Sequence, residues 1–117
     1  MTPLGLRIRE LRLRKGVTLK DMAEAFDVSS AYLSALEHGK RGRPSRMFVQ
    51  RICEYFNIIW DDADDLERLA SLSHPRVTVD TAGLGADATE LANRLAQTIR
   101  KLPQAKIARL LAEIKDT

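Results

Sequence analysis

Residues 17–45, VTLKDMAEAFDVSSAYLSALEHGKRGRPS, decide the fold that this sequence predicts. Thr18 can cap the start of a helix, and Asp21 stands three residues later, where its side chain can bond back to the capping residue. Apolar side chains then recur at helical spacing at Leu19, Met22, Ala23 and Phe26. The stretch therefore begins with a short amphipathic helix.

A three-residue turn and a second helix follow. Asp27 tolerates the left-handed backbone that such a turn often needs, and Ser29 can cap the second helix. Leu33 and Leu36 form the buried stripe of that helix. The remaining positions face outward and are mostly small: Ser30, Ala31, Tyr32, Ser34, Ala35 and His38. An exposed face of this kind, followed by a basic loop, suits the major groove of DNA. The pattern predicts a helix-turn-helix.

From about Leu4 to Leu72 the chain resembles the lambdoid-repressor-like helix-turn-helix regulators, also called Xre-type or Cro/C1-type. The matching positions are Thr18-Leu19, Met22-Ala23, Val28-Ser29, Tyr32-Leu33-Ser34, Leu36-Glu37, Gly39 and Pro44. Two positions depart from the family pattern. The family often has a phosphate-contacting Gln where this chain has Leu19, whose side chain has no group to make that contact. It often has Gly where this chain has Asp27, which changes little.

The resemblance implies which residues meet DNA. Bases would be contacted from Ser30, Ala31, Tyr32, Ser34 and Ala35. The DNA backbone would be contacted by Thr18, Lys20, Ser29, His38, Lys40, Arg41, Arg43 and Arg46, with a residue near Arg43 entering a narrow minor groove. None of the base-facing residues is Arg, Gln or Asn, so specificity would rest on hydroxyl groups, thymine methyl contacts and DNA shape. Three alternatives stay open. Tyr32 packs its ring on the protein surface and gives its hydroxyl to a phosphate, His38 ends a solvated helix, and the basic loop is only solvated.

Arg12 and Glu37 match a family pair that joins the first helix to the end of the recognition helix. The resemblance therefore implies a structural salt bridge between them, which would hold the recognition helix on the rest of the domain.

The charge of the chain is divided unevenly. Residues 1–51 hold 11 Lys/Arg and 5 Asp/Glu, a net charge of +6, whereas residues 52–117 hold 8 and 11, a net charge of −3. The two add to the net charge of +3 of the whole chain. The basic part coincides with the predicted helix-turn-helix, as nucleic-acid binding requires.

Other kinds of chemistry find little support. No apolar run approaches the roughly 20 residues of a membrane span, and the N-terminus lacks the apolar stretch of a signal peptide, so we expect a cytoplasmic protein.

The one cysteine, Cys53, lies on an apolar stripe and is expected to fill the core. The acidic run at Asp61, Asp62, Asp64, Asp65 and Glu67 suits a helix start better than a metal site. We expect no enzyme, no cofactor and no metal.

The chain is expected to be all-α, with a five-helix DNA-binding domain over residues 1–72. The helices are predicted at about 4–14, 19–26, 30–38, 46–57 and 61–71. Residues 73–86 read as a linker, in which the β-branched alternation of residues 76–79 is typical of a short strand. Residues 87–117 would form a helical pair, with an apparent capping box at Asp87 and Glu90 and a break at Pro103. Trp60 is expected in the core or at an interface.

The sequence thus predicts a DNA-binding transcriptional regulator, most simply a repressor that binds a palindromic operator as a homodimer. The dimer contacts would be apolar residues beyond His74: Val77, Val79, Leu91, Leu95, Ile99, Ile107, Leu110, Leu111 and Ile114. The alternative is an antitoxin-type or accessory regulator whose C-terminal half binds another protein. A third class, an interaction module that has lost DNA binding, gains a little from Leu19.

Overall fold

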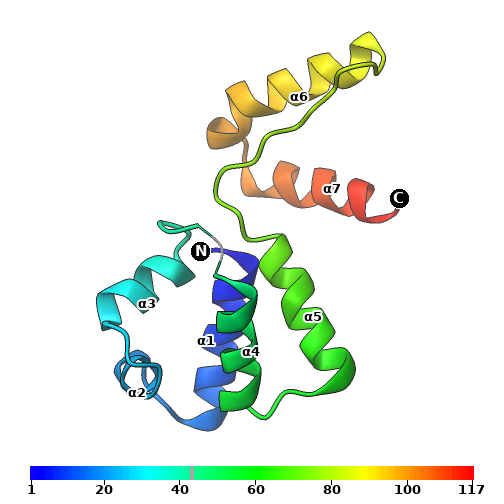
Figure 1. The fold of residues 1–117 in the computed structure, drawn as a ribbon. Helices are drawn as coiled ribbons and strands as arrows, with labels where there is room; N and C mark the ends of the chain where they lie inside the picture. The colour runs from blue at the N-terminus through cyan, green and yellow to red at the C-terminus, as the bar shows by residue number, and fades with distance from the viewer. Residues whose placement is uncertain (43) are drawn as a thin grey trace. The chain divides into compact units, whose positions relative to one another are not determined.

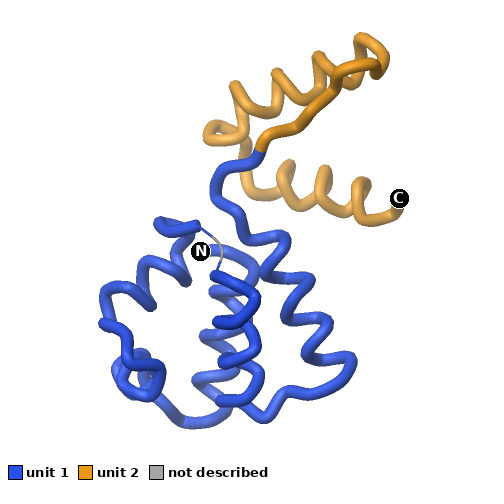
Figure 2. The backbone as a smooth tube through the Cα atoms, in the orientation of Figure 1, with its two compact units in different colours: residues 1–77 blue, residues 78–117 orange. Residues whose placement is uncertain are grey.

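The computed structural model describes residues 1–42 and 44–117, which fall into two compact units, residues 1–77 and residues 78–117 (Figure 2). Every regular element among the described residues is a helix, which confirms the prediction of an all-α protein. Unit 1 holds five helices, shown in Figure 1: α1 Pro3–Lys15, α2 Leu19–Ala25, α3 Ser30–Glu37, α4 Arg46–Tyr55 and α5 Trp60–Ser71. Helix α1 contacts both α3 and α5, α2 contacts α3, and α4 contacts α5.

The core of unit 1 is built from the apolar stripes of these five helices. Its fully buried side chains include Ile8, Met22, Leu33, Ile52 and Leu66. Burial of a side chain of this size contributes roughly 1.5–3 kcal/mol relative to exposure, so the buried stripes are a large stabilising contribution to unit 1. The predicted helix bounds in unit 1 differ from the observed bounds by at most two residues.

Unit 2 is a pair of helices with little core of its own. It contains α6 Ala86–Thr98, the short 3-10 helix η1 Ile99–Lys101 and α7 Gln104–Lys115, and none of these elements buries a side chain fully. Forty residues expose too much of their surface to form a stable core alone.

Two local expectations were wrong, and a third was wrong in part. Residues 76–79 form no strand, because a strand needs a neighbour to pair with and no other segment of the described chain is a strand. Helix α6 begins behind Gly85 without a side-chain cap, and Glu90 pairs instead with Arg94, so no capping box is present there. Trp60 is 81% exposed at the start of α5, so the expectation of a place in the core is wrong, whereas the alternative, a place at an interface, stays a prediction.

Cys53 is half-buried and packs against the core of unit 1. Burial raises the pKa of the Cys53 thiol, and the carboxylates of Glu67 and Glu54 raise it further. A thiol with a raised pKa stays protonated near neutral pH and is a poor nucleophile, which agrees with a packing role.

Candidate nucleic-acid interface

The start of α2 is fixed by a reciprocal capping box. The hydroxyl of Thr18 accepts a hydrogen bond from the Asp21 amide at 3.0 Å, and a carboxylate oxygen of Asp21 accepts one from the Thr18 amide at 2.9 Å. The hydrogen bond from the Thr18 amide is the main cause of a lowered pKa of Asp21, and a hydrogen bond with the Thr18 side chain lowers this pKa further. The capping box that the sequence predicted is confirmed.

The turn between α2 and α3 has the expected left-handed residue and an additional support. Asp27 has a φ of 54°, in the left-handed region. Arg51, from α4, donates a hydrogen bond at 2.9 Å to the carbonyl of Phe26, the residue that closes α2, and its guanidinium lies 4.8 Å from the centre of the Phe26 ring. Sequence reasoning missed Arg51, because the contact spans 25 residues of chain.

Helix α3 presents the residues that were predicted to meet bases. Ser29 caps it by accepting a hydrogen bond from the Tyr32 amide at 3.0 Å. Leu33 and Leu36 are buried below the helix. None of the five predicted base-facing residues is fully buried. Ser30 and Ala31 are exposed, and Tyr32, Ser34 and Ala35 are half-buried. The opposite face of α3 is thus committed to the core, and the small residues are left accessible.

The C-terminal end of α3 is held by α1 through a buried ion pair. Nη2 of Arg12 lies 3.1 Å from Oε1 of Glu37, and the two side chains are only 12% and 1% exposed. The backbone carbonyl of Glu37 also accepts a hydrogen bond from the Thr2 amide at 3.0 Å. Gly5 lies against the same carbonyl so closely that an added Cβ would be 2.1 Å from its oxygen. Helix α3 is therefore fixed at both ends.

The predicted backbone-contacting residues lie around α3. Thr18, Lys20, Ser29 and His38 are exposed, and so are the loop residues Lys40 and Arg41. Nδ1 of His38 bonds to the carbonyl of Ser34 at 2.8 Å, and the side chain as a whole is exposed. Arg43 lies outside the described residues. Nε of Arg46 lies 3.5 Å from Oε1 of Glu67, but the arginine side chain is 81% exposed, so this ion pair is weak.

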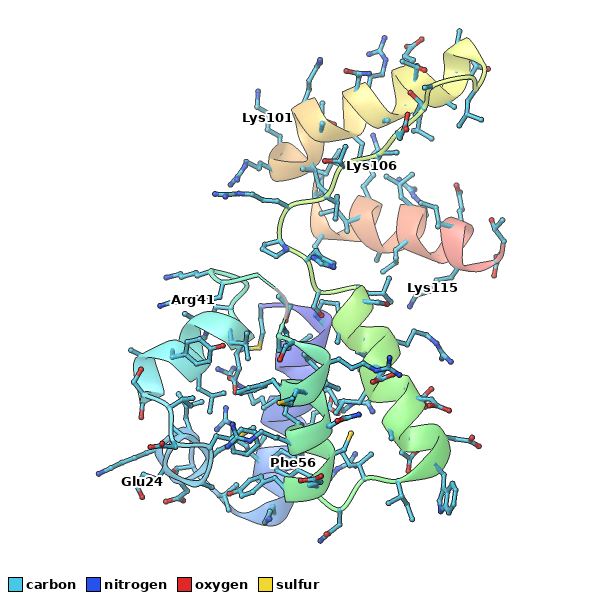
Figure 3. The ribbon with its side chains drawn as sticks, viewed as in Figure 1. Glu24, Arg41, Phe56, Lys101, Lys106 and Lys115 are labelled. Atoms are coloured by element: carbon cyan, nitrogen blue, oxygen red, sulfur yellow. The ribbon has the colours of Figure 1, made fainter. Side chains whose placement is uncertain are left out.

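Tyr32 is partly engaged in packing. Its ring contacts the core residue Phe48 edge-on, with 6.3 Å between ring centres. On its other side, the guanidinium carbon of Arg41 lies 5.4 Å from the ring centre. Figure 3 shows Arg41 in the loop that follows α3. The ring therefore links the core to the basic loop.

The residues predicted to form a dimer remain largely uncovered. Val77, Val79, Leu91, Leu95, Ile99, Leu111 and Ile114 are exposed, and Ile107 and Leu110 are half-buried. Among the described residues, no helix is long and apolar enough to cross a membrane, and no three His, Cys, Asp or Glu side chains gather as a metal site would require.

Comparison with known proteins agrees with this geometry. A family model described as a helix-turn-helix domain matches residues 3–69. The transcriptional regulator RghRB of Bacillus subtilis (strain 168) is 31% identical over 62 residues, which cover 53% of this chain and 45% of the relative. The regulator SinR of the same organism is 31% identical over 55 residues, covering 47% and 50%. The regulator DdrOP3 of Deinococcus deserti is 43% identical over 56 residues, covering 48% and 43%.

The matched stretch therefore spans about half of each of these relatives. No solved structure matches the chain.

Proposed function

Because the chain belongs to the Xre-like helix-turn-helix regulator family, which is not enzymatic, we propose that it is a transcriptional regulator that binds duplex DNA through α3 and the loop after it. One observation carries the proposal. Helix α3 is held to α1 at its C-terminal end by the Arg12–Glu37 ion pair, and Arg51 of α4 supports the turn before it. It presents small side chains outward and is followed directly by the exposed cations Lys40 and Arg41. A rigid helix of this kind can enter the major groove while the cations contact phosphates.

A test of this interface compares two alanine substitutions, Lys40→Ala and Arg68→Ala, each of which removes one positive charge. Replacing Lys40 with alanine should weaken binding to all duplex sequences and lower the slope of log affinity against log salt by about 1, since one phosphate contact is lost. Arg68→Ala is the matched control, because Arg68 lies on α5 and is paired with Asp65. Fluorescence anisotropy of a labelled duplex between about 50 and 200 mM salt gives both slopes. Equal slopes for the two variants would contradict the proposed interface.

We further propose that two copies bind one palindromic operator, with unit 2 forming the contact between them. Leu91 on α6 and Ile114 on α7 are 66% and 67% exposed, and neither helix buries any side chain fully, so the apolar stripes of unit 2 are left without cover. A second copy could bury them against their own equivalents, as in a two-fold symmetric interface. Such a dimer would place two α3 helices roughly 34–36 Å apart, one turn of DNA.

The same exposed side chains favour one alternative, in which unit 2 binds a different protein, as an antitoxin-type or accessory regulator would. In either case we propose that the outcome at the DNA is repression. A small protein that occupies an operator blocks access to it by steric exclusion and needs no additional surface for that effect.

A further inference from the structure

Five of the six aromatic side chains of the protein form a continuous row through unit 1. Neighbouring ring centres are 4.9–6.3 Å apart, within the range of favourable edge-on aromatic contacts. In order, the row runs through Phe56, Tyr55, Phe26, Phe48 and Tyr32. Figure 3 labels Phe56, where the row begins at the end of α4, and Arg41, which lies beyond its other end. The row thus leads from the end of α4, through the core residues Phe26 and Phe48, to Tyr32 on α3.

Arg41 contacts the ring of Tyr32, which distinguishes it from Arg46 in the described part of the basic region. Its guanidinium carbon lies 5.4 Å from the centre of the Tyr32 ring, within the distance of a cation–π interaction. In the part of the chain that the structure describes, no carboxylate forms an ion pair with Arg41, whereas Arg46 is paired with Glu67. The charge of Arg41 is therefore held in place by a ring and is not neutralised by an acid.

We propose that Tyr32 is a positioning residue, which uses its ring to hold Arg41 against α3 so that the guanidinium meets a DNA phosphate. An exposed arginine loses rotamer freedom when it binds a phosphate, and a ring that already restricts it reduces this loss. The ring is itself fixed, since Phe48 of the core packs against it. The inference rests on the proposed DNA binding. If the Tyr32 hydroxyl contacted a base or a phosphate, its removal would weaken DNA binding. In the positioning role the ring alone is needed, and the hydroxyl is dispensable.

The experiment is a double-mutant cycle on affinity for a labelled duplex, at a temperature where circular dichroism shows every variant folded. Tyr32→Phe keeps the ring and should bind as the unmodified protein does. Tyr32→Leu should bind about two- to fivefold more weakly per subunit, the size expected for an exposed cation–π contact. In a protein that already carries Arg41→Ala, the same Tyr32→Leu change should have no further effect.

Lys40 provides the matched control, since it is a neighbouring exposed cation that lies over no aromatic ring of the described chain. Tyr32→Leu should weaken binding as much in a Lys40→Ala protein as in the unmodified one. If Tyr32→Phe binds as weakly as Tyr32→Leu, or if the Tyr32 and Arg41 effects simply add, the inference is wrong.

A second readout needs no DNA and separates this inference from the proposed function. Ring currents should shift the Arg41 side-chain proton resonances upfield in the unmodified protein and in Tyr32→Phe, and the shift should be absent in Tyr32→Leu. Equal Arg41 resonances in all three proteins would overturn the positioning role. Retained shifts in a protein that fails to bind any duplex would overturn the proposed function while leaving the contact in place.

Discussion

Replacing Glu37 with alanine is expected to lower the free energy of unfolding by on the order of 3–5 kcal/mol. The substitution removes the carboxylate that lies 3.1 Å from Arg12 and leaves the guanidinium, only 12% exposed, without a partner. The contact is not fully satisfied even in the native protein, since Nε of Arg12 and Oε2 of Glu37 are buried without hydrogen bonds. Urea denaturation followed by circular dichroism measures the loss.

A double substitution separates the loss of a partner from the value of the pair. Arg12→Met combined with Glu37→Leu removes both charges and fills the space with apolar atoms, so it should cost much less than Glu37→Ala alone. This control keeps the prediction testable even if Glu37→Ala is largely unfolded. A Glu37→Ala denaturation curve that superimposes on that of the unmodified protein would show that the pair is solvated and contributes little.

Gly5→Ala is expected to destabilise unit 1 by on the order of 3 kcal/mol, the upper part of the usual range for overpacking. In most helix interiors the same change is stabilising by roughly 0.5–1 kcal/mol, because alanine is the better helix former. Here the new Cβ would lie 2.1 Å from the carbonyl oxygen and 2.8 Å from the carbonyl carbon of Glu37. Both are backbone atoms, so α1 and α3 must separate to admit the methyl group.

Gly42→Ala is the matched control for this effect. A Cβ at Gly42 meets nothing within 4 Å, so the substitution should change the free energy of unfolding by no more than about 0.5 kcal/mol. Thermal melts of the two variants beside the unmodified protein give the comparison. A Gly5→Ala protein as stable as Gly42→Ala would mean that the close approach of α1 to α3 is not required.

The parts of the fold that could be predicted from the sequence are those set by local patterns. Thr18 and Asp21 are three residues apart, and the capping box they form depends only on that spacing. The helices of unit 1 follow from apolar periodicity in the same way. Asp27 was expected in a left-handed turn because few other residues tolerate that conformation, and its φ of 54° agrees.

The contacts that fix α3 in space were beyond prediction because they join distant parts of the chain. Arg51 supports the turn from 25 residues away, and Gly5 meets the end of α3 at a distance that no sequence pattern encodes. The stacking of Arg41 on Tyr32 depends on the path of a loop, which periodicity does not define. The core alternative for Trp60 failed for a different reason. A large apolar residue usually signals burial, yet this side chain is exposed at the start of α5.

The most direct test of the central claim is selection of the sequences that the full chain binds from a random pool of duplex DNA. DNA recognition by α3 in a dimer predicts enrichment of one site with two-fold symmetry, whose half-sites are centred roughly one helical turn apart. Sedimentation of the same protein should then show two copies. A single asymmetric half-site with a monomeric protein would contradict the dimer and leave unit 2 to another partner. A pool that shows no enrichment, and no binding at about 50 mM salt, would contradict DNA recognition itself.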